Sequence, residues 1–156
     1  MTGAPGTPET ASRVLGLFCE LCAIASPAGD ERAMADRVGA ELTAMGLAWD
    51  EDATGAVTGS NAGNLHCLLP GTVEGTPIFL CAHLDTVPVT GPLEPVVEDG
   101  VVRNAGGAIL GADNKAAVAA MLEGVRRIVE DGTPHAGVEL LFTTMEEVVR
   151  TTIADS

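Results

Sequence analysis

Two strand-like runs constrain the fold of this chain most, because each has the length of a buried strand and each is followed by acidic residues. Residues 78–84 are apolar on both faces, and residues 138–144 form the second run. Between them, apolar residues at helical spacing predict a helix over 114–129. Strands that alternate with helices indicate an α/β layered sheet. The doubly apolar run 78–84 is predicted to lie inside that sheet rather than at its edge.

Turn and helix signals divide the rest of the chain into short elements. The Asp99-Gly100 pair predicts a two-residue hairpin turn within 96–103, and the Gly/Ser/Asn-rich stretch that ends at Gly63 predicts a loop. The other expected elements are helices over 10–24 and 30–45 and strands over 47–52 and 65–69.

The charge of the chain argues against two classes of partner. Its 22 acidic and 8 basic residues give a net charge of −14, whereas proteins that bind nucleic acid or anionic membranes are normally basic. The N-terminus does not resemble a signal peptide, and no apolar run reaches about 18 residues, the length of a membrane span. We therefore expect a cytoplasmic protein with neither a nucleic-acid nor a membrane partner.

Cysteine, histidine and lysine residues outside the acidic clusters receive structural interpretations. Cys19 and Cys22 form a CxxC pair inside an apolar helical pattern, so they are interpreted as buried thiols. Cys81 shares strand parity with His83, but it is also interpreted as a buried neutral thiol. The residues interpreted as structural, exposed or paired with a carboxylate are His66, His135 and Lys115.

Three acidic clusters follow the predicted elements and supply the groups of a hydrolytic metal site. His83 and Asp85 lie two residues apart at a strand end, so both side chains point to the same side. Asp113 begins the long helix, where it either caps backbone N–H groups or binds cations. Glu146 and Glu147 serve one site only if the backbone bends there. Each cluster alone has a structural explanation, but together they lie where open α/β sheets place ligands.

These clusters resemble the N-terminal signatures of the M20 metallopeptidases, and they are most similar to the tripeptide aminopeptidase (peptidase T-like) branch. The segments that carry the resemblance are 83–88 (HLDTVP), 110–115 (LGADNK) and 144–148 (TMEEV), within a similarity that covers 11–148.

The resemblance implies a three-layer α/β/α sheet of the zinc-exopeptidase kind, incomplete and without a lid domain. It also implies a cis peptide bond between Asp113 and Asn114. It divides the chain into a disordered lead-in (1–8), a partial metallopeptidase catalytic domain (9–148) and a tail outside the family pattern (149–156).

The resemblance further implies the roles of the cluster residues. His83, Asp113 and Glu147 would bind two divalent metal ions, zinc in the family, with Asp113 as the bridging ligand. Asp85 would orient His83. Glu146 would be the general base that takes a proton from the water attacking the carbonyl of a small peptide.

The chain departs from the family pattern soon after Glu147. The family continues with a further carboxylate ligand, a late histidine ligand and an inserted lid domain that often dimerises. A frameshift or a gene fragment is the expected cause of this departure. Three interpretations stay open, namely an M20 aminopeptidase, an M20 deacylase or dipeptidase, and a truncated remnant that binds metal weakly or not at all. Association of copies is compatible with each of them.

Overall fold

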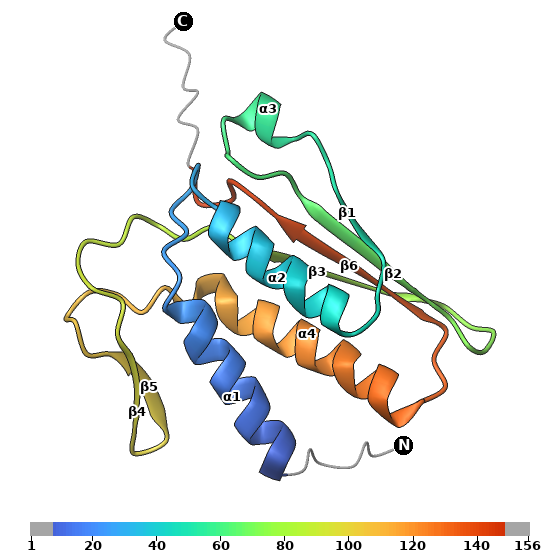
Figure 1. The fold of residues 1–156 in the computed structure, drawn as a ribbon. Coiled ribbons are helices and arrows are strands. Elements are labelled where there is room, and N and C mark those ends of the chain that lie inside the picture. Colours follow the sequence, from blue (N-terminus) through green and yellow to red (C-terminus); the bar gives the residue numbers. More distant parts are fainter. Residues whose placement is uncertain (1–7, 149–156) are drawn as a thin grey trace, which may run out of the picture.

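The computed structural model describes residues 8–148, and its central element is a mixed four-stranded sheet (Figure 1). Strand β2 is antiparallel to both of its neighbours, whereas the last two strands in the sheet run parallel to each other. The order across the sheet is β1 (Trp49–Glu51), β2 (Leu65–Pro70), β6 (Gly137–Thr143) and β3 (Ile78–His83). A separate hairpin consists of β4 (Pro95–Glu98) and β5 (Val101–Asn104), and the helices are α1 (Pro8–Cys22), α2 (Arg32–Ala44), α3 (Gly55–Thr58) and α4 (Ala112–Asp131).

Most expected elements are present, and their local signals explain where they turn or end. The hairpin β4–β5 turns through Asp99 and Gly100, both of which have positive φ, as a two-residue hairpin loop of this kind requires. Gly132 ends α4 in a left-handed conformation. The short helix α3 lies in the stretch that was predicted as a loop. Apart from Pro8, which begins α1, the expected lead-in and tail lie outside the described residues.

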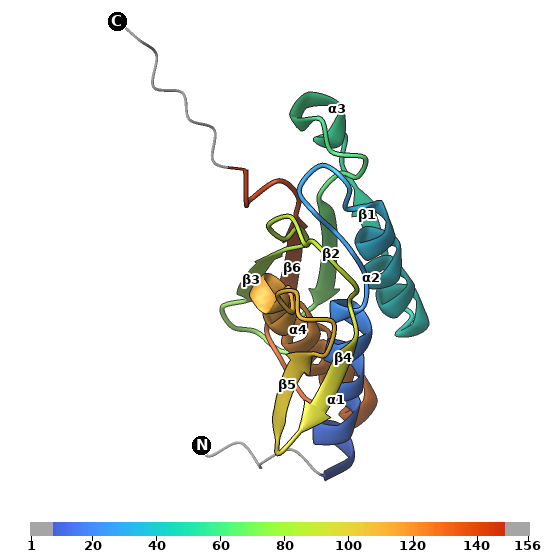
Figure 2. The ribbon, with the colours of Figure 1, turned by 90° about the vertical axis from the view of Figure 1, so that its left-hand side faces the viewer.

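Helices α2 and α4 pack against one face of the sheet, and α1 packs against α4 on the same side (Figures 1 and 2). In β6 the side chains of Val138, Leu140 and Phe142 are buried against these helices, while those between them are partly exposed on the other face. Within residues 8–148, no helix combines the length and the apolar character that a membrane span requires. The buried helical residues that complete this core include Leu21, Met34, Val38, Leu42, Val118, Leu122 and Val125.

The predicted interior position of β3 is wrong for the described residues, because β3 lies at the edge of the sheet and pairs only with β6. Ile78 and Phe79 are accordingly 57% and 55% exposed. Cys81 is exposed as well, which corrects its interpretation as a buried thiol. Phe79 and Cys81 share the sheet face that points away from the helices. The described residues therefore supply the sheet and one helical layer of the expected three-layer arrangement.

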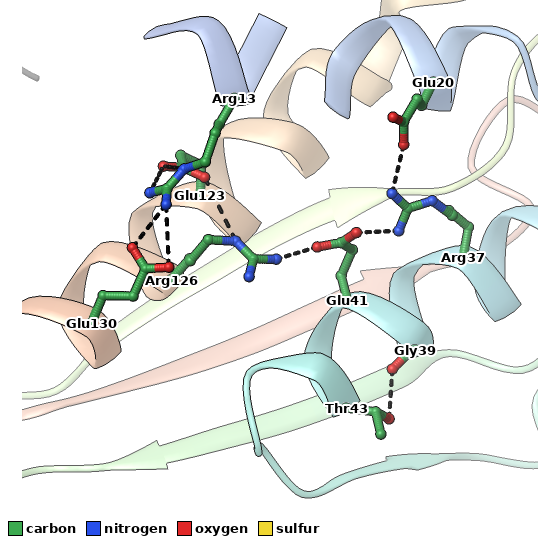
Figure 3. A network of polar contacts seen from close by, with 9 residues as sticks. All are labelled: Arg13, Glu20, Arg37, Gly39, Glu41, Thr43, Glu123, Arg126 and Glu130. Carbon is green, nitrogen blue, oxygen red and sulfur yellow. Dashed lines mark hydrogen bonds and ion pairs between the residues drawn. The ribbon is translucent and has the colours of Figure 1, made fainter. Parts of the chain in front are cut away.

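A network of ion pairs joins the three helices on their outer side (Figure 3). Its most buried carboxylate is that of Glu123 in α4, whose side chain is 7% exposed and accepts from Arg13 of α1 at 2.7 Å. Arg13 also pairs with Glu130 at 3.0 Å, but the Glu130 side chain is 46% exposed. The members of the network are Arg13, Glu20, Arg37, Glu41, Glu123, Arg126 and Glu130.

Glu123→Gln is expected to destabilise the chain more than Glu130→Gln. Loss of the buried carboxylate leaves Arg13 and Arg126 facing a neutral group, at a cost of about 2 kcal/mol in the free energy of unfolding. The exposed Arg13–Glu130 pair is expected to contribute less, because solvent screens its charges. Urea unfolding of both variants measures the difference in the free energy of unfolding, and equal losses would contradict the larger contribution of the buried Glu123.

Two glycines in helix interiors are expected to respond oppositely to alanine. A Cβ at Gly124 in α4 meets nothing within 4 Å, so Gly124→Ala is expected to raise the free energy of unfolding by about 0.5–1 kcal/mol. A Cβ at Gly39 in α2 would lie 2.5 Å from Cζ2 of Trp49, so Gly39→Ala is expected to lower it by about 1–3 kcal/mol. Thermal and urea unfolding of both variants provide the measurement, and stabilisation by Gly39→Ala would be inconsistent with this packing.

Candidate metal centre

The three acidic clusters meet at the end of the sheet where β3 and β6 finish, because these two strands run parallel. His83 is the register partner of Thr143, so the segments that follow both strands emerge at the same end of the sheet, the site edge. Helix α4 begins there too, which brings Asp113 to within 3.2 Å of His83. This edge is where open α/β sheets place their ligands.

The ring of His83 is buried and held in one orientation by a backbone contact. Its Nδ1 lies 2.9 Å from the carbonyl oxygen of Asp85. Because a carbonyl oxygen accepts only, Nδ1 is the protonated nitrogen. In the neutral ring, the Nε2 lone pair then faces Oδ1 of Asp113 at 3.2 Å. Two electron-pair donors that face each other in this way could both bind one cation.

Asp113 projects from an irregular first turn of α4. Its backbone is non-helical, with φ of −84° and ψ of 114°, and the peptide bond to Asn114 is cis, as expected. Its side chain is 82% exposed. Within the described part of the chain, its carboxylate accepts no hydrogen bond from a backbone N–H of α4, so a helix cap does not describe it. The carboxylate is instead directed toward His83, at the end of the sheet where β3 and β6 finish.

The backbone bends directly before Glu146 and Glu147, as a shared site for both carboxylates requires. Strand β6 ends at Thr143, and Met145 adopts the left-handed region with φ of 63°. Glu146 Oε2 then lies 3.9 Å from His83 Nε2. Glu147 contributes a carboxylate oxygen to a group in which the ligand atoms of His83, Asp113 and Glu147 all lie within 4.8 Å of one another.

Asp85 is fully buried and links the first cluster to the third. Its Oδ2 accepts a hydrogen bond from the backbone N–H of Glu147 at 2.7 Å. Its Oδ1 lies 3.5 Å from His83 Nδ1 and has no hydrogen-bond partner. The expected contact with the far nitrogen of His83 is thus made by the Asp85 carbonyl at 2.9 Å, with the carboxylate beside it.

Comparison with known proteins shows which family the chain resembles. Residues 79–154 match the model of peptidase family M20/M25/M40, a match that extends into the segment set apart above as a tail. A tripeptidase from Staphylococcus aureus is 35% identical with a TM-score of 0.79, over 87% of this chain and 37% of the tripeptidase.

Two further proteins are similar to this chain. Aminopeptidase PepT from Bacillus cereus is 36% identical with a TM-score of 0.77, over 85% of this chain and 36% of PepT. YqjE from Bacillus subtilis is 38% identical over 135 residues, which are 86% of this chain and 36% of YqjE. The predicted resemblance to peptidase T-like proteins and the α/β fold are confirmed. The chain spans about a third of the length of these relatives.

Lys115 is buried, which corrects its interpretation as a residue that is exposed or paired with a carboxylate. Its Nζ donates a hydrogen bond to the carbonyl oxygen of Ile24, in the connection between α1 and α2. Burial lowers the pKa of Lys115 to about 8. Burial also raises the pKa of the neighbouring Cys22 thiol to about 11, against the opposing effect of the lysine charge. A sequence signal was available, because Lys115 lies on the same helical face as Val118 and Leu122.

The other two histidines lie away from the candidate metal centre. His66 Nε2 is 2.8 Å from Oε1 of Glu139 on the open face of the sheet, and this hydrogen bond raises the pKa of His66. His135 precedes β6, where its carbonyl oxygen accepts from the N–H of Thr72 at 2.8 Å. Neither joins the group formed by His83, Asp113 and Glu147.

The buried position of Lys115 predicts a rise in stability with pH. The folded pKa of about 8 lies below the ordinary value of 10.5, so between these pH values the unfolded chain binds more protons than the folded chain. The free energy of unfolding is therefore expected to increase by about 2 kcal/mol from pH 8 to pH 10 through this residue.

Lys115→Met removes this contribution, and no other lysine is present in the chain. Urea unfolding at both pH values gives the difference in the free energy of unfolding between the wild type and Lys115→Met. If this difference is the same at pH 8 and pH 10, the lowered pKa of Lys115 is contradicted.

Proposed function

We propose that this chain carries part of the active site of a metal-dependent peptide hydrolase. In this proposal His83, Asp113 and Glu147 hold divalent metal, and Asp113 bridges two ions. The observation that supports it most directly is the mutual proximity, within 4.8 Å, of one ligand atom from each of these residues. They come from three segments that are distant in sequence and that the fold brings to one edge of the sheet.

The donor set fits zinc. It consists of one imidazole nitrogen and carboxylate oxygens, which bind Zn²⁺ at about 2.0–2.2 Å. His83 presents Nε2 to the site because Nδ1 is engaged by the Asp85 carbonyl. Asp113 has a second carboxylate oxygen, and its exposure leaves that oxygen open to another ion. When bound, such ions acidify a water molecule and polarise the carbonyl of the bond to be cleaved.

The residues of the chain divide the remaining work. Glu146 lies beside His83, outside the group of three candidate ligands, and its exposed carboxylate accepts the proton of the attacking water. Asp85 fixes the ring of His83 through its carbonyl and the backbone of Glu147 through its carboxylate. Two adjacent carboxylates thereby take different roles, one as a base and one as a ligand.

Peptides are the proposed substrate class. Two proteins that share more than a third of their aligned residues with this chain are a tripeptidase and an aminopeptidase. Both names describe hydrolases that act on short peptides or at a peptide terminus. We therefore assign this chain to the hydrolysis of short peptides, with N-acylated amino acids as the competing substrate class within the family.

The metal site is tested by calorimetric titration of the metal-free chain with Zn²⁺. Glu147→Ala is expected to weaken binding by more than about tenfold, because it removes a ligand. Glu139→Ala is the matched control, since it removes a carboxylate on the open face that lies outside the group. Equal affinity of wild type and Glu147→Ala, or no binding by the wild type, would contradict the site.

Hydrolysis is tested with a tripeptide and an N-acetyl amino acid in the presence of zinc. Glu146→Gln is expected to lower tripeptide turnover by at least about 100-fold while zinc affinity stays within about threefold of the wild type. Cleavage of only the N-acetyl compound would assign the chain to deacylation. Zinc binding without any turnover would support the reading as a non-catalytic remnant.

A further inference from the structure

The bend that carries Glu146 and Glu147 is held by side chains from elsewhere in the chain. The bend lies outside regular secondary structure. Three of its backbone N–H groups, in the segment 144–147, donate instead to side-chain oxygens of three other segments. The contacts are Thr144 N–H to Asn64 Oδ1 at 3.1 Å, Met145 N–H to Glu31 Oε1 at 3.1 Å, and Glu147 N–H to Asp85 Oδ2 at 2.7 Å.

Glu31 is the least expected of these acceptors, because its carboxylate is completely buried. It occupies the N-cap position of α2 but makes no side-chain hydrogen bond to that helix. Its Oε2 accepts from the Ser60 hydroxyl at 2.5 Å, and its Oε1 accepts from Met145. Among the described residues it forms no ion pair. Hydrogen bonds and the N-terminus of α2 are therefore what compensate its burial.

The Met145 contact lies at the point where the chain changes direction. A non-glycine residue in the left-handed region costs about 1 kcal/mol or more, so it persists only where surrounding contacts impose it. Glu31 Oε1 binds the N–H of this residue. The directions of the next two side chains follow from the φ and ψ angles of Met145. Glu31 thus acts on the site without touching it.

The connection between α1 and α2, to which Glu31 belongs, also touches the other two site segments. Ser26 donates its hydroxyl to the carbonyl of Leu84 at 2.9 Å, and its own carbonyl accepts from Thr86 N–H at 2.8 Å. The carbonyl of Ile24 accepts from Lys115. One short stretch of chain therefore contacts the segments that carry His83, Asp113 and Glu147.

We propose that Glu31 is a positioning residue of the metal centre, which places the Glu146–Glu147 pair by holding the backbone of Met145. This inference rests on the proposed metal site. In this proposal the length of the side chain at position 31, rather than its charge, determines whether the contact with Met145 forms. Glutamine at this position keeps the length and an acceptor oxygen, whereas aspartate keeps the charge but is one methylene too short for Met145.

The test compares Glu31→Gln, Glu31→Asp and Glu31→Ala by calorimetric zinc titration at a temperature where circular dichroism shows each to be folded. Glu31→Gln is expected to bind zinc within about threefold of the wild type, and Glu31→Asp and Glu31→Ala at least about tenfold more weakly. Asp30→Asn is the matched control, because it removes an exposed carboxylate one residue away whose contact is with Asn61. Wild-type affinity in folded Glu31→Asp and Glu31→Ala would overturn the proposal.

A second readout does not depend on metal. Hydrogen exchange of the Met145 amide in the metal-free chain is expected to accelerate at least about tenfold in Glu31→Asp and Glu31→Ala and to stay near the wild-type rate in Glu31→Gln. If the wild type binds no zinc, the proposed function fails. The exchange rate of the Met145 amide then tests by itself whether Glu31 holds the backbone of Met145. Unchanged protection of Met145 in Glu31→Asp would then overturn the role of Glu31.

Discussion

The parallel pairing of β3 with β6 is the constraint on which the candidate site depends. It places His83 beside Thr143 and makes both strands end at one edge of the sheet. Helix α4, which lies between them in the sequence, starts at that same edge and brings Asp113 to His83. Groups separated by 30 or more residues thereby converge at or just beyond the ends of regular elements.

The site segments are irregular, and polar contacts from a single connection hold them in place. Hydrogen bonds from the stretch between α1 and α2 reach the loop after β3, the first turn of α4 and the bend after β6. Several of these contacts use buried polar groups, which are costly unless satisfied. The strand pairing brings these segments together, and the buried hydrogen bonds then fix their local geometry.

The two faces of the sheet differ in what covers them. One face is covered by the three helices, which an ion-pair network also ties together on their outer side (Figure 3). On the other face Phe79 and Cys81 are exposed, and His66 pairs with Glu139. The candidate metal centre belongs to neither face, since it lies at the end of the sheet where β3 and β6 finish.

Local patterns were sufficient to predict most elements and the candidate residues. The helical spacing in α4, the Asp99-Gly100 turn and the strand runs are short-range signals, and each was read within a window of a few residues. The three acidic clusters could be named because metal chemistry restricts the residue types and because each cluster follows a strand or starts a helix. The assignment of His83, Asp113 and Glu147 as ligands came from the resemblance to the M20 metallopeptidases. The condition on Glu146 and Glu147, a backbone bend, could also be stated from strand geometry alone.

The sequence by itself determined the elements and the chemistry available at their ends, because both depend on neighbours along the chain. Only the tertiary structure decided which strand lies at the edge, since a period of two shows which residues share a face but not which strand pairs alongside. It likewise decided the burial of Lys115 and the contact of Glu31 with Met145. That contact joins residues 114 positions apart, so no local pattern could indicate it.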